Sequence, residues 1–513
     1  MGWMTQSEIV ADQDCGYGYL RAAKPPWLTD SCHPHSPCPI PRWRLIPMAP
    51  LPSPSAPAPA IETMRALVQR GESRSLDWRI GQLDCLQRLL HLEESQARSA
   101  LAADLGKPEL EAHFELVAVR QELDLTRRHL RRWMRPRSVG LPAWALPGRA
   151  AIHPEPLGCV LILGPWNYPL QLCLHPLVSA LAAGNTAVLK PSEHAPHTAN
   201  WMAAAVARHF DPQHVQVVVG DAEAATTLLE QRFDHIFFTG GGRVGRLVMA
   251  AAARHLTPVT LELGGKSPAI VLGGADPQTT ARRLIWGKGL NAGQTCVAPD
   301  HLLVVAAAVS PLIEACAKEI ERLYGQDPLT SSDLGQIVNE RQFERLEGLL
   351  TGARQKGQIL LGGGSDRHRR RMEPTLIAVD QPEDDPLMQE EIFGPLMPLI
   401  VVDDLEDALA RVRRAPHPLA LYLFGGNSKE RQQLLATTSS GSVGFNDVVM
   451  QAGLVQLPFG GVGESGLGSY HGETGFHTFS HQRSVLSRSF WFDLPFRYPP
   501  YAGKLPLVRR LLG

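Results

Sequence analysis

Short runs of consecutive apolar residues, separated by helical stretches, constrain the fold of this chain more than any other sequence feature. In the first half these runs lie at residues 159–163, 186–189, 215–219 and 235–238. Strands that are apolar at successive positions are typical of a parallel sheet covered by helices on both faces. The alternation predicts an open, Rossmann-like α/β domain, in which nucleotides bind at the carboxyl ends of the strands.

A second series of apolar runs follows the segment Leu261-Glu262-Leu263-Gly264-Gly265-Lys266, at residues 269–272, 302–305, 399–402 and 419–424. It predicts a second α/β domain built around Cys296. The glycines after Glu262 allow the backbone to turn between the two lobes. A chain of 513 residues is long enough for two or three such domains.

The first sixty residues differ from the rest because they are rich in proline. Such a composition is unlike that of a packed element, so residues 1–60 are predicted to form a disordered extension, and the start codon is left open. Order is expected from near Ile61. Ser75 is predicted to cap a helix with apolar residues at helical spacing, and another helix is predicted from about residue 109 to 134.

Composition excludes several classes of partner. The 50 basic residues are scattered and balanced by 51 acidic ones, which argues against a nucleic-acid partner. The eight cysteines show neither CxxC nor metal-type spacing, so no metal site is expected, and a reduced cytoplasmic compartment is the simplest interpretation. No apolar run is long enough to span a bilayer; the Leu/Arg tail at 505–513 predicts membrane contact that is weak and peripheral at most.

Cys296, in the segment Asn291-Ala292-Gly293-Gln294-Thr295-Cys296, is the candidate nucleophile. A thiolate attacks a carbonyl well, and the open turn before it offers backbone N–H groups that can hold an oxyanion. Taken alone, a cysteine after such a turn is more often a small buried hydrophobe. Cys159 and Cys173 lie in apolar runs and are interpreted as core.

Three further segments carry polar groups at places where they can act. Asn167, in a proline-bracketed turn after a predicted strand, can direct its amide at a developing negative charge. Glu262, buried at an apolar strand end, can activate water as a base. Glu391 and Phe393 can hold a ribose and pack on a nicotinamide. Each segment alone also fits an ordinary turn or a solvated carboxylate.

In this order, the segments Pro-Trp-Asn, Lys-Pro-Ser-Glu, Phe-Thr-Gly, Glu-Leu-Gly-Gly-Lys, Gly-Gln-Thr-Cys and Glu-Ile-Phe-Gly-Pro resemble those of the aldehyde dehydrogenase superfamily. The resemblance covers about residues 61–490. It is greatest for the class 3 group, the dimeric fatty and aromatic aldehyde dehydrogenases, on segments such as Phe479-Ser480-His481-Gln482-Arg483. Ala292 and the stretch Gly241-Gly242-Arg243 depart from the pattern expected of animal members.

The resemblance implies a role for each matching residue. Cys296 would be the nucleophile, and Asn167 with the Cys296 N–H would form the oxyanion hole. Glu262 would be the base that hydrolyses the thioester, with Glu391 as a competing candidate. The residues implied in binding NAD or NADP are Lys190, Glu193, Gly240, Gly245, Glu391 and Phe393.

The resemblance also implies an organisation and a reaction. The expected parts are an NAD(P)-binding domain at 61–135 and 157–262, an α/β catalytic domain at 263–465, a small β oligomerisation extension made of bridging segments at 136–156 and 466–490, and a tail at 491–513. The expected protein is a homodimer that oxidises medium- or long-chain aliphatic or aromatic aldehydes to acids. A CoA-acylating dehydrogenase and a catalytically silent homologue are the alternatives.

Tyr168, Trp286 and Phe445 are candidates to line the substrate tunnel. Residues 135–149 and 460–468 are expected to be irregular.

Overall fold

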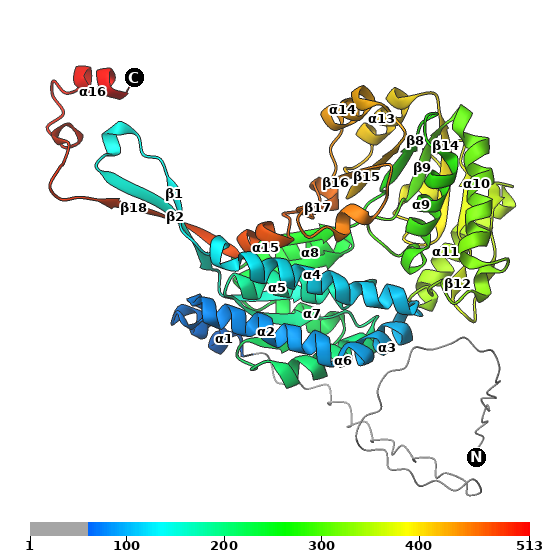
Figure 1. The fold of residues 1–513 in the computed structure, drawn as a ribbon, viewed down its shortest axis with the longest axis horizontal. Helices are drawn as coiled ribbons and strands as arrows, with labels where there is room; N and C mark the ends of the chain where they lie inside the picture. Colours follow the sequence, from blue (N-terminus) through cyan, green and yellow to red (C-terminus); the bar gives the residue numbers. More distant parts are fainter. Residues whose placement is uncertain (1–59, 513) are drawn as a thin grey trace, which may run out of the picture. The chain divides into compact units, whose positions relative to one another are not determined.

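The computed structural model describes residues 60–512, so the predicted disordered extension lies outside the described residues except for its last position. The described chain is an α/β structure with a six-stranded, a seven-stranded and a three-stranded sheet (Figure 1). A two-stranded pair is formed by β11 (Ser365–Asp366) and β12 (Arg371–Met372). The α/β fold class predicted from alternating apolar runs and helices is confirmed.

The six-stranded sheet has the strand order of a doubly wound nucleotide-binding fold, β17-β7-β6-β3-β4-β5. Its strands are β3 (Cys159–Leu163), β4 (Thr186–Lys190), β5 (Val215–Val217), β6 (His235–Gly240), β7 (Val259–Leu263) and the antiparallel β17 (Gly466–Leu467). The chain runs outward from β3 to β5 and returns to β6 on the other side of β3. The direction reverses between β3 and β6, and ligands bind at the carboxyl ends of strands at such a switch point.

The four predicted strands of this sheet are present, and one is shorter than expected. β5 ends two residues before position 219, because it is the edge strand and Val219 is exposed. β17 pairs with β7, so the start of the predicted 466–490 segment shares a sheet with Glu262. β17 also lies in the stretch 460–468, so the expectation that this stretch is irregular was wrong at these two residues.

Helices cover the six-stranded sheet on both faces, because right-handed crossovers that run outward and then back place their helices on opposite sides. The connecting helices are α5 (Gln171–Ala182), α6 (Pro196–His209), α7 (Ala222–Leu229) and α8 (Gly242–Ala253). The N-terminal helices are α1 (Ile61–Gln69), α2 (Leu76–Leu92), α3 (Glu94–Leu105) and α4 (Glu109–Trp133). Ser75 caps α2 as predicted, because its hydroxyl accepts a 3.2 Å hydrogen bond from the Trp78 N–H.

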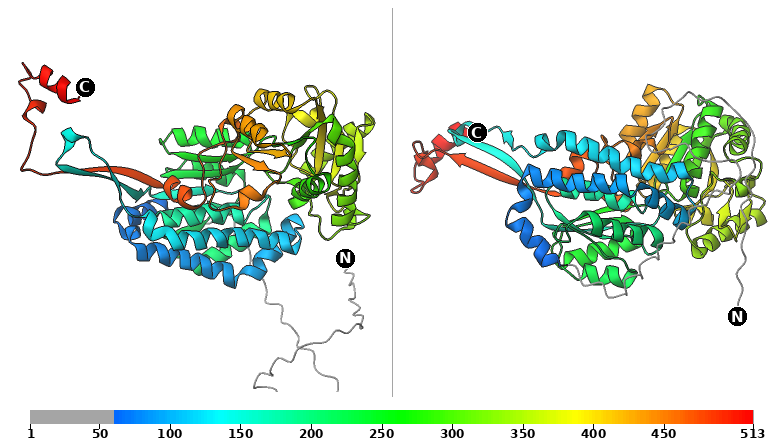
Figure 2. Two further views of the ribbon diagram at one scale, coloured as in Figure 1. Left: turned by 45° about the horizontal axis from the view of Figure 1, so that its top comes forward. Right: turned by 60° about the horizontal axis from the view of Figure 1, so that its bottom comes forward.

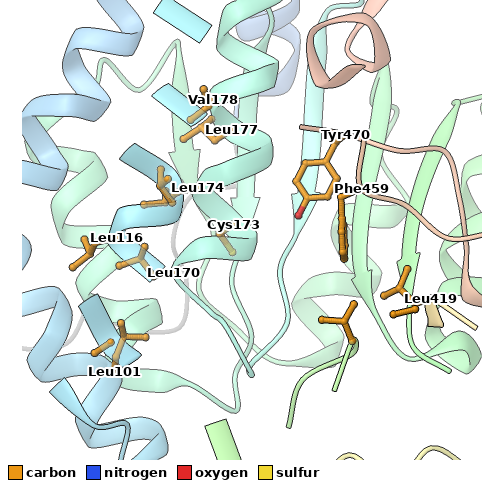
Figure 3. Packing of buried hydrophobic residues seen from close by; sticks show 14 of the residues in the cluster. Leu101, Leu116, Leu170, Cys173, Leu174, Leu177, Val178, Leu419, Phe459 and Tyr470 are labelled. Atoms are coloured by element: carbon orange, nitrogen blue, oxygen red, sulfur yellow. The ribbon is translucent and has the colours of Figure 1, made fainter. Parts of the chain in front are cut away.

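The contact between α4 and α5 fixes the turn that precedes α5. Leu116 of α4 is fully buried, as are Leu170, Leu174 and Leu177 around α5, and they share one apolar core (Figure 3). Burying each leucine side chain contributes about 1.5–3 kcal/mol relative to exposure. The turn after β3, which carries Asn167, therefore ends on a rigidly packed helix.

The seven-stranded sheet has the order β10-β13-β14-β9-β8-β15-β16. Its strands are β8 (Pro268–Val271), β9 (His301–Val305), β10 (Ile359–Leu361), β13 (Thr375–Ala378), β14 (Leu396–Val402), β15 (Ala420–Phe424) and β16 (Ser442–Phe445). All neighbours are parallel except β10 and β13. Its helices include α9 (Pro277–Gly289), α10 (Ala306–Tyr324), α11 (Glu340–Gln355), α13 (Leu405–Arg414) and α14 (Ser428–Thr437). The four runs predicted for the second lobe lie in or overlap β8, β9, β14 and β15.

The third sheet is an antiparallel arrangement of β1 (Arg137–Val139), β2 (Gly148–Pro156) and β18 (Ser480–Arg488). β2 and β18 pair along nine residues each and are seen as long paired strands in Figure 2. The expectation that residues 135–149 are irregular was wrong in part, since β1 and the start of β2 lie there. β1 has no apolar run that would reveal it, and its order comes from pairing with β2.

The described C-terminal residues end in α16 (Leu505–Leu512), on which Leu505 and Leu507 are exposed. Between residues 60 and 512, no helix has both the length and the apolarity needed to cross a membrane. The five cysteines in this range are all free.

Candidate active site

Cys296 lies in the loop that joins α9 to β9, at the amino end of the seven-stranded sheet. Asn291, Ala292 and Gly293 adopt left-handed backbone conformations in succession, with φ of 52°, 52° and 74°. The side chain of Gln294 stabilises this reversal, because its amide donates to the carbonyls of Asn291 and Gln336, each at 2.9 Å. The Cys296 loop is therefore held in one conformation by bonds that Gln294 makes in both directions.

Asn167 follows β3 at the carboxyl end of the six-stranded sheet and contacts the Cys296 loop directly. Its side-chain Nδ2 donates to the Gln294 carbonyl at 3.0 Å, and its own carbonyl accepts from Asn291 Nδ2 at 2.8 Å. The Tyr168 and Thr295 hydroxyls are 2.7 Å apart. An asparagine amide has two N–H donors, so one remains for a further acceptor beside Cys296. The structure thus places Asn167 against the loop that carries Cys296.

Glu262 is buried in β7, where its backbone lies between Thr239 of β6 and Gly466 of β17. Neither carboxylate oxygen has a hydrogen-bond partner within residues 60–512. Burial raises the pKa of Glu262 well above its ordinary value, because an ionised carboxylate loses its hydration there. Burial therefore disfavours the charged form of Glu262, and both carboxyl oxygens are available to a water or a reacting group.

Glu391 lies against the linker that follows Glu262. A Cβ atom built on Gly264 would stand 2.0 Å from Glu391 Oε2, so only glycine allows this approach. Burial, and then the charge of Asp300, raise the pKa of Glu391 to about 8, while a hydrogen bond from the Gly265 N–H opposes the increase. Glu391 thus lies against the linker at Gly264 and Gly265, two and three residues after Glu262.

The loop that carries Glu391 and Phe393 is held by an ion pair between the partly buried Lys266 and the buried Asp300. Lys266 Nζ is 2.5 Å from Asp300 Oδ2 and donates to the Glu390 carbonyl at 2.9 Å. Asp300 Oδ1 accepts from the Ile392 N–H at 2.8 Å. This pair ties the Glu391 loop to the strand that follows Cys296.

The electrostatics of Cys296 link the sulfur to both glutamates. Burial raises the pKa of the Cys296 thiol to about 12, with further contributions from the charges of Glu391 and then Glu262. Hydrogen bonds from the backbone N–H groups of Cys296 and Val297 oppose the increase. The thiol is protonated at neutral pH in this environment, so its attack on a carbonyl requires a proton acceptor or a nearby positive charge.

The predicted cofactor residues lie at the switch point of the six-stranded sheet. Lys190 ends β4, and its Nζ bonds to Glu193 Oε2 at 2.9 Å. Gly240 ends β6, and α8 begins two residues later. Gly245 is buried in the first turn of α8, where a Cβ atom would stand only 2.7 Å from Leu263 of β7. The first turn can therefore pack closely on the sheet and direct its N–H groups at a phosphate, which fits a dinucleotide.

Phe393 completes the predicted set from the other lobe. Its ring packs edge-on against Trp166, with centroids 5.2 Å apart. Trp166 precedes Asn167 in the turn after β3, so this aromatic pair joins the Glu391 loop to the turn that carries Asn167.

Motif reasoning missed several charged residues that support the site. Glu111 and Glu115 of α4 bond to backbone N–H groups of the Cys296 loop and of α5. Lys288 of α9 is buried, and this burial lowers its pKa to about 8. For Glu115 a signal existed, because it shares helical spacing with the buried positions Val119 and Glu122.

The three residues predicted to line a tunnel differ in their surroundings. Tyr168 touches the Cys296 loop through Thr295. Phe445 lies in β16 beneath the guanidinium of Arg431, at 5.3 Å. Trp286 is partly buried in α9. Of the three, only Tyr168 has a side chain that forms a hydrogen bond to the Cys296 loop within residues 60–512.

Comparisons with known proteins point to one family. Residues 56–485 match the family model described as the aldehyde dehydrogenase family. The chain is 46% identical over 447 residues to aldehyde dehydrogenase family 3 member B1 of Rattus norvegicus, which covers 86% of this chain and 94% of the relative. It is 44% identical over 449 residues to the rat protein called aldehyde dehydrogenase, dimeric NADP-preferring, with coverage of 87% and 98%.

A solved structure agrees with these matches. The structure described as the substrate bound state of Staphylococcus aureus AldH aligns with a TM-score of 0.85 at 38% identity. The alignment covers 88% of this chain and 98% of that one.

Proposed function

Since this chain belongs to the aldehyde dehydrogenase family and oxidises aldehydes with NAD or NADP, we propose that Cys296 is its nucleophile and Asn167 its oxyanion donor. The observation that carries this assignment is the bond from Asn167 Nδ2 to the Gln294 carbonyl, two residues before Cys296. It holds an amide donor of one lobe against the loop of the other lobe that carries the thiol. An amide donor fixed in this way can stabilise a negative oxygen without reorganising.

The proposed reaction proceeds through two covalent states of Cys296. Glu262 or Glu391, in its ionised form, takes the proton of the Cys296 thiol and passes it to solvent. The thiolate attacks the aldehyde carbon, and the resulting thiohemiacetal oxygen is held by Asn167 and the Cys296 N–H. A bound nicotinamide supplies the acceptor for the hydride lost from this carbon. The Cys296 thioester is then cleaved by a water molecule from which a glutamate removes a proton, releasing the acid and the free thiol.

Glu262 is our first assignment for this base, because its two oxygens are buried and have no partner within residues 60–512. Glu391 is the second candidate. Its charge contributes more than that of Glu262 to the raised pKa of Cys296, and its own pKa of about 8 suits a base near neutral pH.

We assign cofactor binding to the two lobes together. Lys190 and Glu193 would hold the adenosine ribose, Gly240 and Gly245 would lie beside the phosphates, and Glu391 and Phe393 would position the nicotinamide ribose. Support comes from the close packing that Gly245 allows at the start of α8 and from the Lys190–Glu193 pair. The carboxylate of Glu193 would repel a 2′-phosphate, although a glutamate that turns aside would admit one.

The proposed substrates are medium- or long-chain aliphatic or aromatic aldehydes. The Tyr422 hydroxyl donates to the Val297 carbonyl at 2.6 Å and accepts from the Val449 N–H at 3.1 Å. The segment that begins at Val449 continues with Met450, Leu454 and Leu457, each about half exposed. This segment offers an apolar surface near Cys296 for a substrate chain.

An aldehyde series tests the substrate class and the cofactor. Purified protein is assayed with aldehydes of two to sixteen carbons and with benzaldehyde, with NAD and NADP separately. We expect kcat/KM to rise about tenfold or more between short and medium chains, because each buried methylene contributes about 0.8 kcal/mol. We also expect NAD to exceed NADP, and acid to form without CoA. A flat profile contradicts the proposed substrate class. A requirement for CoA contradicts release of the acid by water and favours the acylating alternative.

We also propose a homodimer in the cytoplasm, with membrane contact that is weak and peripheral at most. Apolar side chains are exposed on α8, at Val244, Leu247 and Met249, and on β18, at Val485 and Leu486. Burial of these side chains against a second subunit would explain why they are exposed in a single subunit. A reducing compartment agrees with the five free cysteines of residues 60–512.

The dimer proposal predicts the mass in solution. Light scattering of the purified wild-type chain should give twice the mass of one 56.1 kDa subunit. Leu247→Asp combined with Leu486→Asp should give one subunit mass, because charges would be buried in the interface. Leu435→Asp, on exposed α14, is the matched control and should leave the dimer intact. A wild-type monomer, or a dimer that persists in the double variant, contradicts this interface.

A further inference from the structure

Helix α4 makes hydrogen bonds to both sides of the proposed oxyanion hole, although none of its residues belongs to a recognised motif. Glu111 Oε2 accepts from the Asn291 N–H at 2.9 Å. Glu115 Oε2 accepts from the N–H groups of Leu170 and Gln171 at 3.1 and 3.0 Å. Residues four positions apart lie on one face of a helix, so one face of α4 bonds both to the Cys296 loop and to the start of α5.

The bond from Glu111 reaches the Cys296 loop where its backbone is strained. Asn291 and Ala292 both have φ of 52°, a region that residues other than glycine rarely occupy. Such conformations persist only where the surroundings hold them. Glu111 supplies part of this support from outside the loop, while Gln294 supplies it from within.

The bonds from Glu115 fix the other side. Its second oxygen, Oε1, is 2.5 Å from Lys107 Nζ, and both side chains are fully buried. Lys107 Nζ also lies 4.0 Å from the centre of the Tyr168 ring. Lys107 and Glu115 thus anchor the turn that runs from Asn167 to α5, beneath Tyr168.

The two sides also bond to each other, through Asn291 with Asn167 and through Asn167 with Gln294. The distance between the Asn167 amide and the Cys296 sulfur is therefore set by α4 and by these cross-links together. On the basis of the proposed function, we propose that Glu111 is a positioning residue, which holds the Cys296 loop in register with the oxyanion donor Asn167. It touches neither aldehyde nor cofactor, and it acts through Asn291.

Two variants distinguish the effect of the length of the Glu111 side chain from the effect of its charge. Glu111→Asp keeps the charge but withdraws the oxygens by about 1.5 Å, one C–C bond. Glu111→Gln removes the charge but keeps an oxygen that can accept from the Asn291 N–H. Asp124→Asn, on the exposed face of α4, is the matched control. We expect the first turnover, followed as reduced cofactor, to slow about 10- to 100-fold in Glu111→Asp, since small misplacements cost this much. Glu111→Gln should stay within about threefold of wild type.

Alkylation of Cys296 by iodoacetamide distinguishes positioning from general damage. The sulfur displaces iodide in this reaction, and no oxyanion forms. We expect the alkylation rate and the KM for the cofactor to be unchanged in Glu111→Asp, while the first turnover slows. Equal first-turnover rates in Glu111→Asp and Asp124→Asn overturn the proposal. Parallel loss of alkylation and turnover also overturns it, as does a Glu111→Gln variant as slow as Glu111→Asp.

Failure of the proposed function itself would look different. In that case wild-type protein and Cys296→Ala would turn over aldehydes equally, whatever the Glu111 variants do. The wild-type rate and its dependence on Cys296 are therefore measured in the same series.

Discussion

Cys296→Ala abolishes aldehyde oxidation, with an expected loss in kcat of at least about 10⁴-fold, the scale seen when a covalent nucleophile is removed. The reason is that both the thiohemiacetal and the thioester require the sulfur, so the variant has no route to either covalent state. The measurement is reduced-cofactor formation at saturating aldehyde. Cofactor binding, followed by fluorescence quenching, should be unchanged, because the predicted phosphate and adenosine contacts lie at the other sheet.

A second thiol on the same chain controls for loss of a cysteine as such. Cys85 lies in α2, is free and is partly buried. Cys85→Ala should keep activity within about twofold of wild type, since surface-near substitutions usually change stability by at most about 0.5 kcal/mol. Turnover by Cys296→Ala at more than a hundredth of the wild-type rate would show that Cys296 is not the nucleophile.

Much of the fold was predictable because its sheets are buried. Strands buried on both faces must be apolar at successive positions, and the runs at 159–163 and 302–305 have that pattern. Strands that are ordered only by pairing with a neighbouring strand need no run of apolar residues in the sequence. β1 and β17 are examples, since each is short, and neither contains an apolar run. The expectation of irregular structure was wrong at these two strands for that reason.

The candidate site was predictable residue by residue but not as an arrangement. Each motif places one functional group after one strand, and the order of motifs identified the family. The bond between Asn167 and Gln294 joins positions 127 residues apart, and no local pattern encodes it. The role of Glu111 depends on a contact across 180 residues, and a glutamate near a helix start is ordinary in sequence. Long-range contacts of this kind need the structure.

The arrangement also explains why two lobes are required. Ligand sites in parallel sheets lie at the carboxyl ends of strands, and the six-stranded sheet follows this rule with Asn167 and Gly240. Cys296 instead precedes β9, at the amino end of its own sheet. Neither sheet alone holds both the thiol and the oxyanion donor. The proposed chemistry therefore depends on the linker after Glu262, which joins the two sheets. It also depends on α4, which bonds to both the Cys296 loop and the start of α5.

The choice between Glu262 and Glu391 has the second-largest expected effect. Replacing the residue that activates water with glutamine should leave formation of the Cys296 thioester intact and slow its hydrolysis by about 10²- to 10⁴-fold, the usual contribution of a general base. A rapid burst of about one reduced cofactor per subunit, followed by slow turnover, would mark that variant. Mass spectrometry of the quenched protein should find the acyl group on Cys296.

Glu262→Gln, Glu391→Gln and the exposed neighbour Glu390→Gln form a matched series. Glu262→Gln should fold normally, because glutamine has the size of the glutamate side chain and carries no charge, at a site where burial disfavours the charged form. If Glu391 is the base, wild-type hydrolysis should increase as pH rises through about 8, because the ionised form of Glu391 accepts the proton. That increase should then be absent in Glu391→Gln and retained in Glu262→Gln. If instead the burst and the acyl adduct occur in Glu262→Gln alone, the assignment to Glu262 holds. A burst in neither variant would mean that hydrolysis needs neither carboxylate, and both assignments would be wrong.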